Sequence, residues 1–321
     1  MIVLTGPTAS GKSAASVRLA RALDAEIVSV DSGLVYRGLD IGTAKPTLAE
    51  RGGVVHHLID VRDPWEPYSA ADFVADATRL IGEIGARGRL PLLVGGTLLY
   101  VRALERGLAP LPSADPALRA EIAREAEARG WPALHADLAR VDPAVAARVH
   151  PNDPQRLQRA IEVYRLTGVP LGQLHRHTVP ALAVPPVVLA LVPAERRWLH
   201  ERIARRLTAM CEAGLLDEVR SLRADPRITA SLPAMRSVGY RQAWEHLERL
   251  EPAAREPRTG GEADVAWTDR ALFATRQLAK RQLTWLRGMS ALHAVPCDTL
   301  DEAARHTALL AILKRTGVMP S

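Results

Sequence analysis

Hydrophobic residues follow two different patterns along this chain. Uninterrupted runs occur in MIVLTG (1–6), EIVSVDS (26–32), LPLLVGGT (90–97) and PPVVLALV (185–192). Between them, after Lys12 and over 70–86, hydrophobic residues recur every three or four positions. Short runs are typical of buried strands, and the wider spacing indicates helices. Strands that alternate with helices predict an α/β fold, with a parallel sheet flanked by helices and ligand sites at the carboxyl ends of the strands.

The pattern changes between residues 113 and 183, where no strand-like run occurs. Three Asp-Pro pairs, at 115–116, 142–143 and 153–154, place a capping residue before proline, an arrangement that begins a helix. Gly130 and Gly168 stand where helices would end. We therefore predict an all-helical insertion domain over residues 113–183, within a core domain formed by residues 1–112 and 184–321.

Residues after 194 follow a mostly helical pattern. Within this region, EPAAREPRTGGEAD (251–264) predicts a surface loop. The stretch TDRALFATRQLAKRQLTWLRG (268–288) predicts a helix that begins at residue 268 or 269 and ends at Gly288. At 100° per residue, Arg276, Lys280 and Arg287 share one side of this helix, and Ala279 lies on the other. This stripe fits phosphate contacts, although a solvated face in an arginine-biased sequence would look similar.

The segment GPTASGKS (6–13) fits the phosphate-loop template of Gly, four residues, then Gly-Lys-Ser/Thr. In this motif backbone N–H groups surround phosphate oxygens and the lysine neutralises them. Only four of the 42 basic residues are lysines, so a chance match is improbable. The motif predicts a diphosphate or triphosphate ligand without naming it, and a P-loop NTPase-like fold. Its candidate ligands are Gly6, Pro7, Thr8, Ala9, Ser10, Gly11, Lys12 and Ser13.

Two further polar residues follow predicted strands. Asp31 ends IVSVD and Thr97 ends LLVGGT, so both should meet the phosphate loop at one edge of the sheet. A carboxylate in this place either holds magnesium or accepts a proton from an acceptor group. His56 and His57 are adjacent, so on a strand they would point to opposite faces and could not share a metal. We expect them to be structural.

Composition restricts the class of protein. The chain has 321 residues, 47% of them hydrophobic and 24% charged, as expected of a globular protein. Its net charge of +6 suits a polyanionic partner. Two cysteines, Cys211 and Cys297, are too few for a disulfide framework and indicate a reducing compartment. No signal-like or membrane-spanning stretch is evident, so we expect a cytoplasmic protein.

Several longer motifs resemble the bacterial tRNA dimethylallyltransferase family. They run in the family's order from Gly6 to Arg287 and cover nearly the whole chain. These motifs are GPTASGKS, VDSGLVYRGLDIGTAKP, VVHHLIDVRDPWEPYSAADF, LPLLVGGTLLYVRAL, RVHPNDPQRLQRAIEVYRLTG, RSVGYRQ and ATRQLAKRQLTWLR. Only the first is widely shared among other families.

The resemblance implies that the phosphate loop holds dimethylallyl diphosphate. The prenyl group would be transferred to N6 of the adenosine 3′ of the tRNA anticodon, and diphosphate would leave. Asp31 would be the general base and Thr97 would position the reacting groups. Lys12 and Arg206 would stabilise the leaving group, and Ser13 would bind Mg²⁺. We expect a monomer that contacts the anticodon arm.

The resemblance also implies a set of tRNA-binding residues from six parts of the chain. They are Asp31, Ser32, Gly33, Leu34, Thr97, Arg119, Gln155, Arg156, Leu157, Gln158, Arg159, Arg236, Ser237, Val238, Gly239, Tyr240, Arg241, Lys280, Arg281, Gln282, Leu283, Thr284, Trp285, Leu286 and Arg287. Many relatives carry glutamine where this chain has Leu34, so a side-chain amide contact is missing there.

Three alternative functions remain open at this point. A small-molecule kinase would share the phosphate loop but would need an adenine pocket and a lid arginine. An adenylate isopentenyltransferase would use the same donor with a free nucleotide as acceptor. A non-catalytic nucleotide switch could also bind RNA. The helical insertion and the basic helix at 268–288 favour tRNA over the first two, and Asp31 at the crevice argues against the third.

Overall fold

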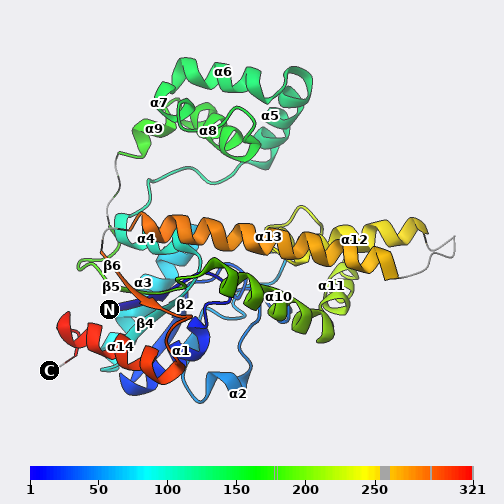
Figure 1. Cartoon of the computed structure of the whole chain (residues 1–321). Helices are drawn as coiled ribbons and strands as arrows, with labels where there is room; N and C mark the ends of the chain where they lie inside the picture. The colour runs from blue at the N-terminus through cyan, green and yellow to red at the C-terminus, as the bar shows by residue number, and fades with distance from the viewer. Residues whose placement is uncertain (177, 179, 254–260, 290, 320–321) are drawn as a thin grey trace. The chain divides into compact units, whose positions relative to one another are not determined.

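The computed structural model describes residues 1–176, 178, 180–253, 261–289 and 291–319. The chain forms two compact units (Figure 1). The core unit comprises Met1–Arg102 and Leu182–Ser321, and the helical unit comprises Ala103–Ala181. The predicted insertion, residues 113–183, covers most of the helical unit.

The core unit is built on a parallel sheet, as the alternation of strands and helices predicted. Its six described strands follow the order β3-β2-β4-β1-β5-β6, and every pairing is parallel. Their bounds are β1 Ile2–Thr5, β2 Ala25–Ser29, β3 His56–His57, β4 Leu90–Gly95, β5 Val187–Val192 and β6 Leu292–Pro296. β1 lies between β4 and β5, so the loop that follows it opens at the middle of the sheet edge.

Helices cover both faces of the sheet and supply most of the core. On one face α1 (Lys12–Ala22) and α14 (Glu302–Arg315) lie side by side (Figure 1). Leu19 of α1 and Leu309 of α14 are fully buried against Leu4 of β1. The remaining helices of the core unit are α2 Leu48–Arg51, α3 Ala70–Ala86, α4 Leu98–Arg106, α10 Arg196–Glu212, α11 Leu215–Arg223, α12 Tyr240–Ala253 and α13 Gly261–Arg287, and α4 continues into the helical unit.

Two strands were not predicted from the sequence. β3 contains only two residues, and β6 (LHAVP) lies in a region predicted to be mostly helical. Only Val295 of β6 is buried, so this edge strand has no uninterrupted hydrophobic run. Pairing with β5 over five residues forms the strand. Edge strands of this kind depend on a tertiary partner more than on their own sequence.

Helix α13 is longer than predicted at its N-terminal end. It ends at Arg287 as expected, but it begins at Gly261 instead of residue 268. Trp267, which is 3% exposed, stacks on His246 of α12, and this packing favours continuation of the helix. The predicted loop at 251–264 is correspondingly too long, because 251–253 end α12 and 261–264 begin α13. Residues 254–260 lie outside the described part of the chain.

The helical unit contains no strand among its described residues. Its helices are α5 Pro116–Arg129, α6 Trp131–Val141, α7 Pro143–Ala146, α8 Pro154–Thr167 and α9 Leu171–Leu174. As the Asp-Pro pairs predicted, Asp115, Asp142 and Asp153 cap three of them by accepting hydrogen bonds from backbone N–H groups. Gly130 and Gly168 follow α5 and α8, as predicted.

A buried carboxylate organises this unit. Glu162 of α8 is fully buried and accepts hydrogen bonds from Arg119 (Nε, 2.8 Å), from Arg159 (Nη1, 2.6 Å) and from the Asp115 backbone (2.9 Å). Burial alone would raise the pKa of Glu162, but the two arginines outweigh it and hold this pKa below its ordinary value. The ion pair therefore ties α5 to α8.

Candidate active site

The phosphate loop joins β1 to α1 in an unusual backbone conformation. Ala9 and Gly11 have positive φ angles of 64° and 90°. A Cβ on Gly6 would lie 2.6 Å from the Leu191 carbonyl oxygen, so only glycine fits there. The loop ends at Lys12, the first residue of α1, where the free N–H groups of a helix favour anions. Local geometry therefore agrees with the phosphate site predicted from GPTASGKS.

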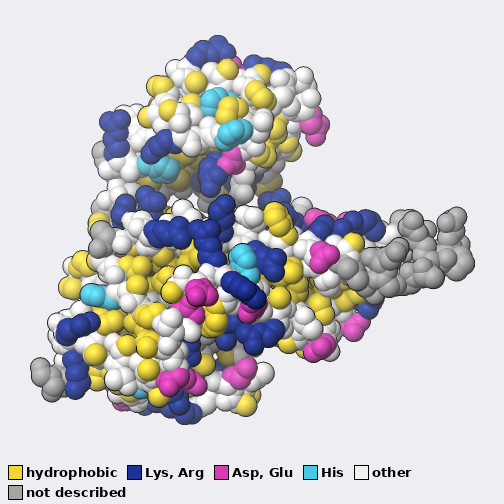
Figure 2. All heavy atoms as spheres, viewed as in Figure 1, with side chains coloured by type: hydrophobic (Ala, Val, Ile, Leu, Met, Phe, Trp, Pro, Cys, Tyr) yellow, Lys and Arg dark blue, Asp and Glu magenta, His cyan; other side chains and the backbone are white. Residues whose placement is uncertain are grey.

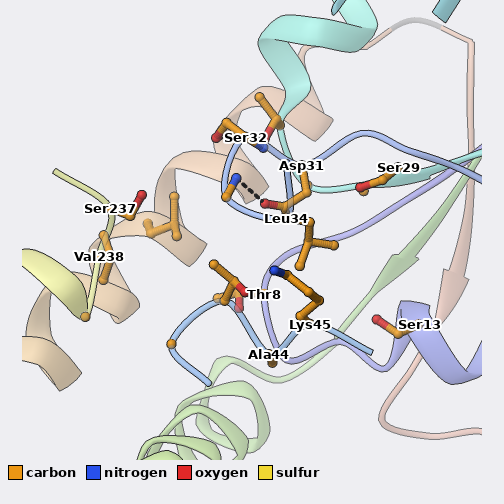
Figure 3. Close-up of a pocket in the computed structure, with 18 of the residues that line it drawn as sticks. Thr8, Ser13, Ser29, Asp31, Ser32, Leu34, Ala44, Lys45, Ser237 and Val238 are labelled. Carbon is orange, nitrogen blue, oxygen red and sulfur yellow. Dashed lines mark hydrogen bonds between the residues drawn. The ribbon is translucent and has the colours of Figure 1, made fainter. Parts of the chain in front are cut away.

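A cavity of about 1100 Å³ opens beside this loop. Asp31, Thr97, Lys12 and Arg206 all line it, so the structure brings together the residues predicted from separate strand ends. Figure 3 shows Asp31 and Ser32 together on one side of the cavity. Ser237 and Val238, from a distant segment of the chain, line another part of it. A smaller cavity of about 200 Å³ on the loop is lined by Lys12, Ser13, Arg202 and Arg206.

The turn after β2 fixes Asp31 next to Thr97. The carboxylate oxygen Oδ1 of Asp31 accepts a hydrogen bond from the Gly33 backbone (2.9 Å), and the Ser32 backbone donates to Oγ1 of Thr97 (3.0 Å). A Cβ on Gly95 would lie only 2.0 Å from the Val30 carbonyl oxygen. Glycine at this position thus lets the two strand ends approach closely enough for these contacts.

Burial and neighbouring charges shift the pKa values of the two cations of the cavity, Lys12 and Arg206. Burial lowers the pKa of Lys12 to about 8, while Asp31 opposes the shift and Arg206 adds to it. Burial also lowers the pKa of Arg206, against the opposing effect of Asp31. An anion in the cavity would be attracted to both side chains, and a bound anion would restore the charged form of Lys12.

The residues that could hold a metal ion are few. Among the described residues, no group of three or more His, Cys, Asp or Glu side chains is arranged to hold one. Ser13 and Asp31 line the same cavity and offer a hydroxyl and a carboxylate oxygen. Mg²⁺ is commonly bound by one or two protein oxygens together with substrate phosphates and water. The oxygen donors of this cavity fit that pattern.

The predicted tRNA-binding residues differ in their burial and in whether they line the cavity. Leu157, Tyr240, Leu283 and Leu286 are buried, with at most 8% of each exposed, so their side chains pack in the interior. Arg119 and Arg159 are held by Glu162, and Gln158 donates to the Arg119 carbonyl oxygen (3.0 Å). The exposed members are Ser32, Gln155, Arg156, Arg236, Arg241, Lys280, Arg281, Thr284, Trp285 and Arg287. Gly33, Leu34, Thr97, Arg236, Ser237, Val238, Gly239, Arg281, Gln282 and Trp285 line the cavity.

Basic side chains gather over the face of the core unit that carries α10 and α13 (Figure 2). On α13, Lys280, Arg281 and Arg287 are exposed, while Ala279 and Leu286 are buried. The predicted division of this helix into a packing side and a basic side is therefore confirmed. Arg276 is the exception, because it is only partly exposed and its Nε is buried.

Two polar residues have structural roles that the sequence did not reveal. Oε1 of Gln282 accepts a hydrogen bond from the Thr8 backbone (2.8 Å), and its Nε2 donates to the Gly96 carbonyl oxygen (3.0 Å). It thus connects the phosphate loop with the Thr97 turn. Lys45 is 5% exposed and donates to the Tyr36 carbonyl oxygen (2.8 Å) and to Asp40 and Asp60. Their partners lie far away in sequence or across a loop, so no local pattern indicates them.

The fold and the site together are those of an enzyme with a P-loop NTPase-like core. Comparison with known proteins makes this more specific. The family model of IPP transferases matches residues 34–289. A protein of Stenotrophomonas maltophilia named tRNA dimethylallyltransferase is 58% identical over 89% of this chain and 89% of its own length. A protein of Methylibium petroleiphilum with the same name is 58% identical over 96% and 92%. The chain belongs to the IPP transferase family.

Solved structures agree with this assignment. The full-length tRNA isopentenylpyrophosphate transferase of Bacillus halodurans aligns with a TM-score of 0.67 and 37% identity, covering 99% of this chain and 97% of that one. A eukaryotic dimethylallyltransferase acting on tRNA aligns with a TM-score of 0.79 and 25% identity, covering 100% and 80%. In the described part of this chain, no helix is both long and apolar enough to cross a membrane.

Proposed function

We propose that this chain transfers a dimethylallyl group from dimethylallyl diphosphate to N6 of the adenosine 3′ of the tRNA anticodon and releases diphosphate. The observation that carries the proposal is one cavity that holds a phosphate loop, two cations and a carboxylate beside a hydroxyl. It is supported by relatives named tRNA dimethylallyltransferase at 54–58% identity. We infer that the enzyme acts as a monomer in the cytoplasm.

In the proposed reaction, a bond forms between N6 of adenosine and the first carbon of the prenyl group. The bond from that carbon to the diphosphate oxygen breaks, and its electron pair leaves with diphosphate. Lys12 and Arg206 are positioned to stabilise the charge that develops there, because positive groups already in place lower such a barrier. Asp31 accepts the proton that N6 loses. Thr97, which accepts a hydrogen bond from Ser32, orients the acceptor.

Mg²⁺ would be held by the Ser13 hydroxyl, and the Asp31 carboxylate lines the same cavity. When bound, it would supply positive charge to the diphosphate oxygens. The protein itself supplies positive charge to these oxygens through the loop N–H groups, Lys12 and Arg206. Ser13 follows Lys12 directly at the start of α1, so the same turn of helix presents both groups to the anion.

The acceptor adenosine would have to leave its stack in the anticodon loop to reach Asp31. Extruding a base costs a few kcal/mol, which contacts to the nucleic acid backbone must offset. The exposed basic residues of α13 and of the segment Arg236–Arg241 are suited to such contacts, because Arg281 of the first and Arg236 of the second line the cavity that holds Asp31. Among the predicted tRNA-binding arginines of the helical unit, Arg156 is the most exposed, at 74% of its side chain, against 40% for Arg119 and 29% for Arg159.

One assay separates this proposal from its main alternatives. The protein is incubated with labelled dimethylallyl diphosphate and either tRNA or AMP. We expect label to enter tRNA, at the adenosine 3′ of the anticodon, and not AMP. Transfer to AMP alone would instead indicate an adenylate isopentenyltransferase. Hydrolysis of ATP stimulated by tRNA, over many turnovers, would favour a kinase or nucleotide switch, and we expect none.

A further inference from the structure

The cavity wall includes a turn formed by residues 40–45. One carboxylate outside the cavity binds three successive backbone N–H groups of this turn. Glu218 of α11 accepts hydrogen bonds from Asp40 (2.9 Å) and Ile41 (2.7 Å) through Oε2, and from Gly42 (3.2 Å) through Oε1. Charge-assisted bonds of this kind are about twice as strong as neutral ones.

A fourth donor completes the set. The Tyr240 hydroxyl donates to Oε1 of Glu218, and its ring is fully buried. Burial first, and then the Glu218 charge, raises the pKa of Tyr240 far above its ordinary value, so the hydroxyl stays protonated and keeps donating. A Cβ on Gly42 would lie 2.5 Å from the Tyr240 ring, so the turn and the ring fit closely.

The turn contacts Arg206 directly and reaches Asp31 only through Gly33. Nη2 of Arg206 donates to the Thr43 carbonyl oxygen (3.2 Å). The Thr43 methyl lies 2.9 Å from where a Cβ on Gly33 would be, and the Gly33 N–H binds Oδ1 of Asp31. Lys45, at the end of the turn, donates to Asp40 at its start and to the Tyr36 carbonyl oxygen. Any shift of residues 40–43 would therefore move the partners of both Arg206 and Asp31.

We propose that Glu218 is a positioning residue: with Tyr240, it holds residues 40–43 in the conformation that orients Arg206 and Asp31 for prenyl transfer. This inference rests on the proposed function only for its kinetic consequence. Glu218 does not line the cavity, and its described hydrogen bonds go to the turn and to Tyr240. Its effect is expected on turnover, with little change in the affinity for tRNA.

The test compares Glu218→Gln with Asp217→Asn. Both variants remove one negative charge from the first turn of α11, but Asp217 is exposed and pairs only with Arg220 in the described contacts. For Glu218→Gln we expect kcat to fall at least about tenfold, because the amide replaces a carboxylate that accepts from four donors. Asp217→Asn should retain the wild-type kcat. The dissociation constants for tRNA and for dimethylallyl diphosphate should stay within about twofold in both variants, as neither removes a ligand.

Amide hydrogen exchange of the unliganded protein provides a second readout. In Glu218→Gln, exchange at residues 40–42 should accelerate about tenfold or more, and exchange in the sheet should not change. Tyr240→Phe removes only one of the four bonds and should produce a smaller effect of the same kind, which keeps the test valid if Glu218→Gln fails to fold. Equal kcat or equal exchange in Glu218→Gln and Asp217→Asn would overturn the proposal. A wild-type protein without transferase activity would contradict the proposed function instead, while the exchange experiment would still report on the turn.

Discussion

Residues 6–13 and helix α8 both contain residues suited to a polyanion, yet they present them in different ways. In the phosphate loop, positive φ angles and a crowded Gly6 fix the backbone, and Lys12 and Ser13 face cavities. In α8, Arg159 already binds a buried carboxylate, and only Arg156 is largely exposed. A backbone motif thus determines where its ligand lies, whereas a basic helix face serves both packing and binding.

The largest effect should be on turnover, when residues that line the cavity are replaced. Replacing Asp31 with Ala should lower turnover by about 100-fold or more while donor and tRNA binding persist, because only the proton acceptor is lost. Replacing Lys12 with Ala should weaken donor binding as well as turnover, because it removes charge from the diphosphate in both states. Single-turnover rates and equilibrium binding with dimethylallyl diphosphate distinguish the two variants. Near-normal turnover in Asp31→Ala would contradict its assignment as the base.

In the helical unit, the predicted tRNA-binding arginines should differ sharply in how much each contributes to the free energy of unfolding. Replacing both Arg119 and Arg159 with Ala leaves the Glu162 carboxylate buried without its cations, which should lower the free energy of unfolding by about 3 kcal/mol or more. Arg156→Ala should change it by less than about 0.5 kcal/mol, because its pair with Asp153 is exposed. Urea denaturation, followed by a signal from the helical unit, measures the free energy of unfolding of both variants. Equal stability of the two variants would show that the Glu162 pairs do not hold α5 to α8.

The contrast between local motifs and long-range contacts also explains which parts of the fold and of the candidate site could be predicted from the sequence. Strands β1, β2, β4 and β5 are buried hydrophobic runs, and capping residues indicated helix boundaries such as Asp115 before α5. The phosphate loop, Asp31 and Thr97 could be placed because parallel strand ends share one edge. Glu218, Gln282 and β6 could not, because each depends on partners more than 90 residues away. The burial of Tyr240 was likewise not indicated by RSVGYRQ, a motif that looks polar as a whole.

The exposed basic side of α13 should contribute a smaller, salt-dependent effect. Neutralising Lys280, Arg281 and Arg287 together should weaken tRNA binding and reduce the slope of log affinity against log salt by up to about three, with donor binding unchanged. A matched variant that neutralises Arg18, Arg79 and Arg220 also removes three exposed charges, but from helices α1, α3 and α11. Parallel lines for the α13 variant and wild type would mean that this side does not contact the tRNA backbone.

The smallest effect concerns the protonation of Lys12. Because burial places the pKa of Lys12 at about 8, its charge is present below that pH and is lost as the pH rises through it. Affinity for dimethylallyl diphosphate should therefore fall by up to about tenfold for each pH unit above this point, and by less where the bound diphosphate raises the pKa. Lys12→Arg provides the control, because guanidinium stays charged throughout this range. Its affinity should be lower at neutral pH, since the planar group fits the loop poorly, but it should be nearly constant between pH 7 and 9. If wild type and Lys12→Arg show the same pH dependence, a group other than Lys12 is responsible for it, and the positive charge that the phosphate loop presents to its ligand does not depend on this lysine's titration.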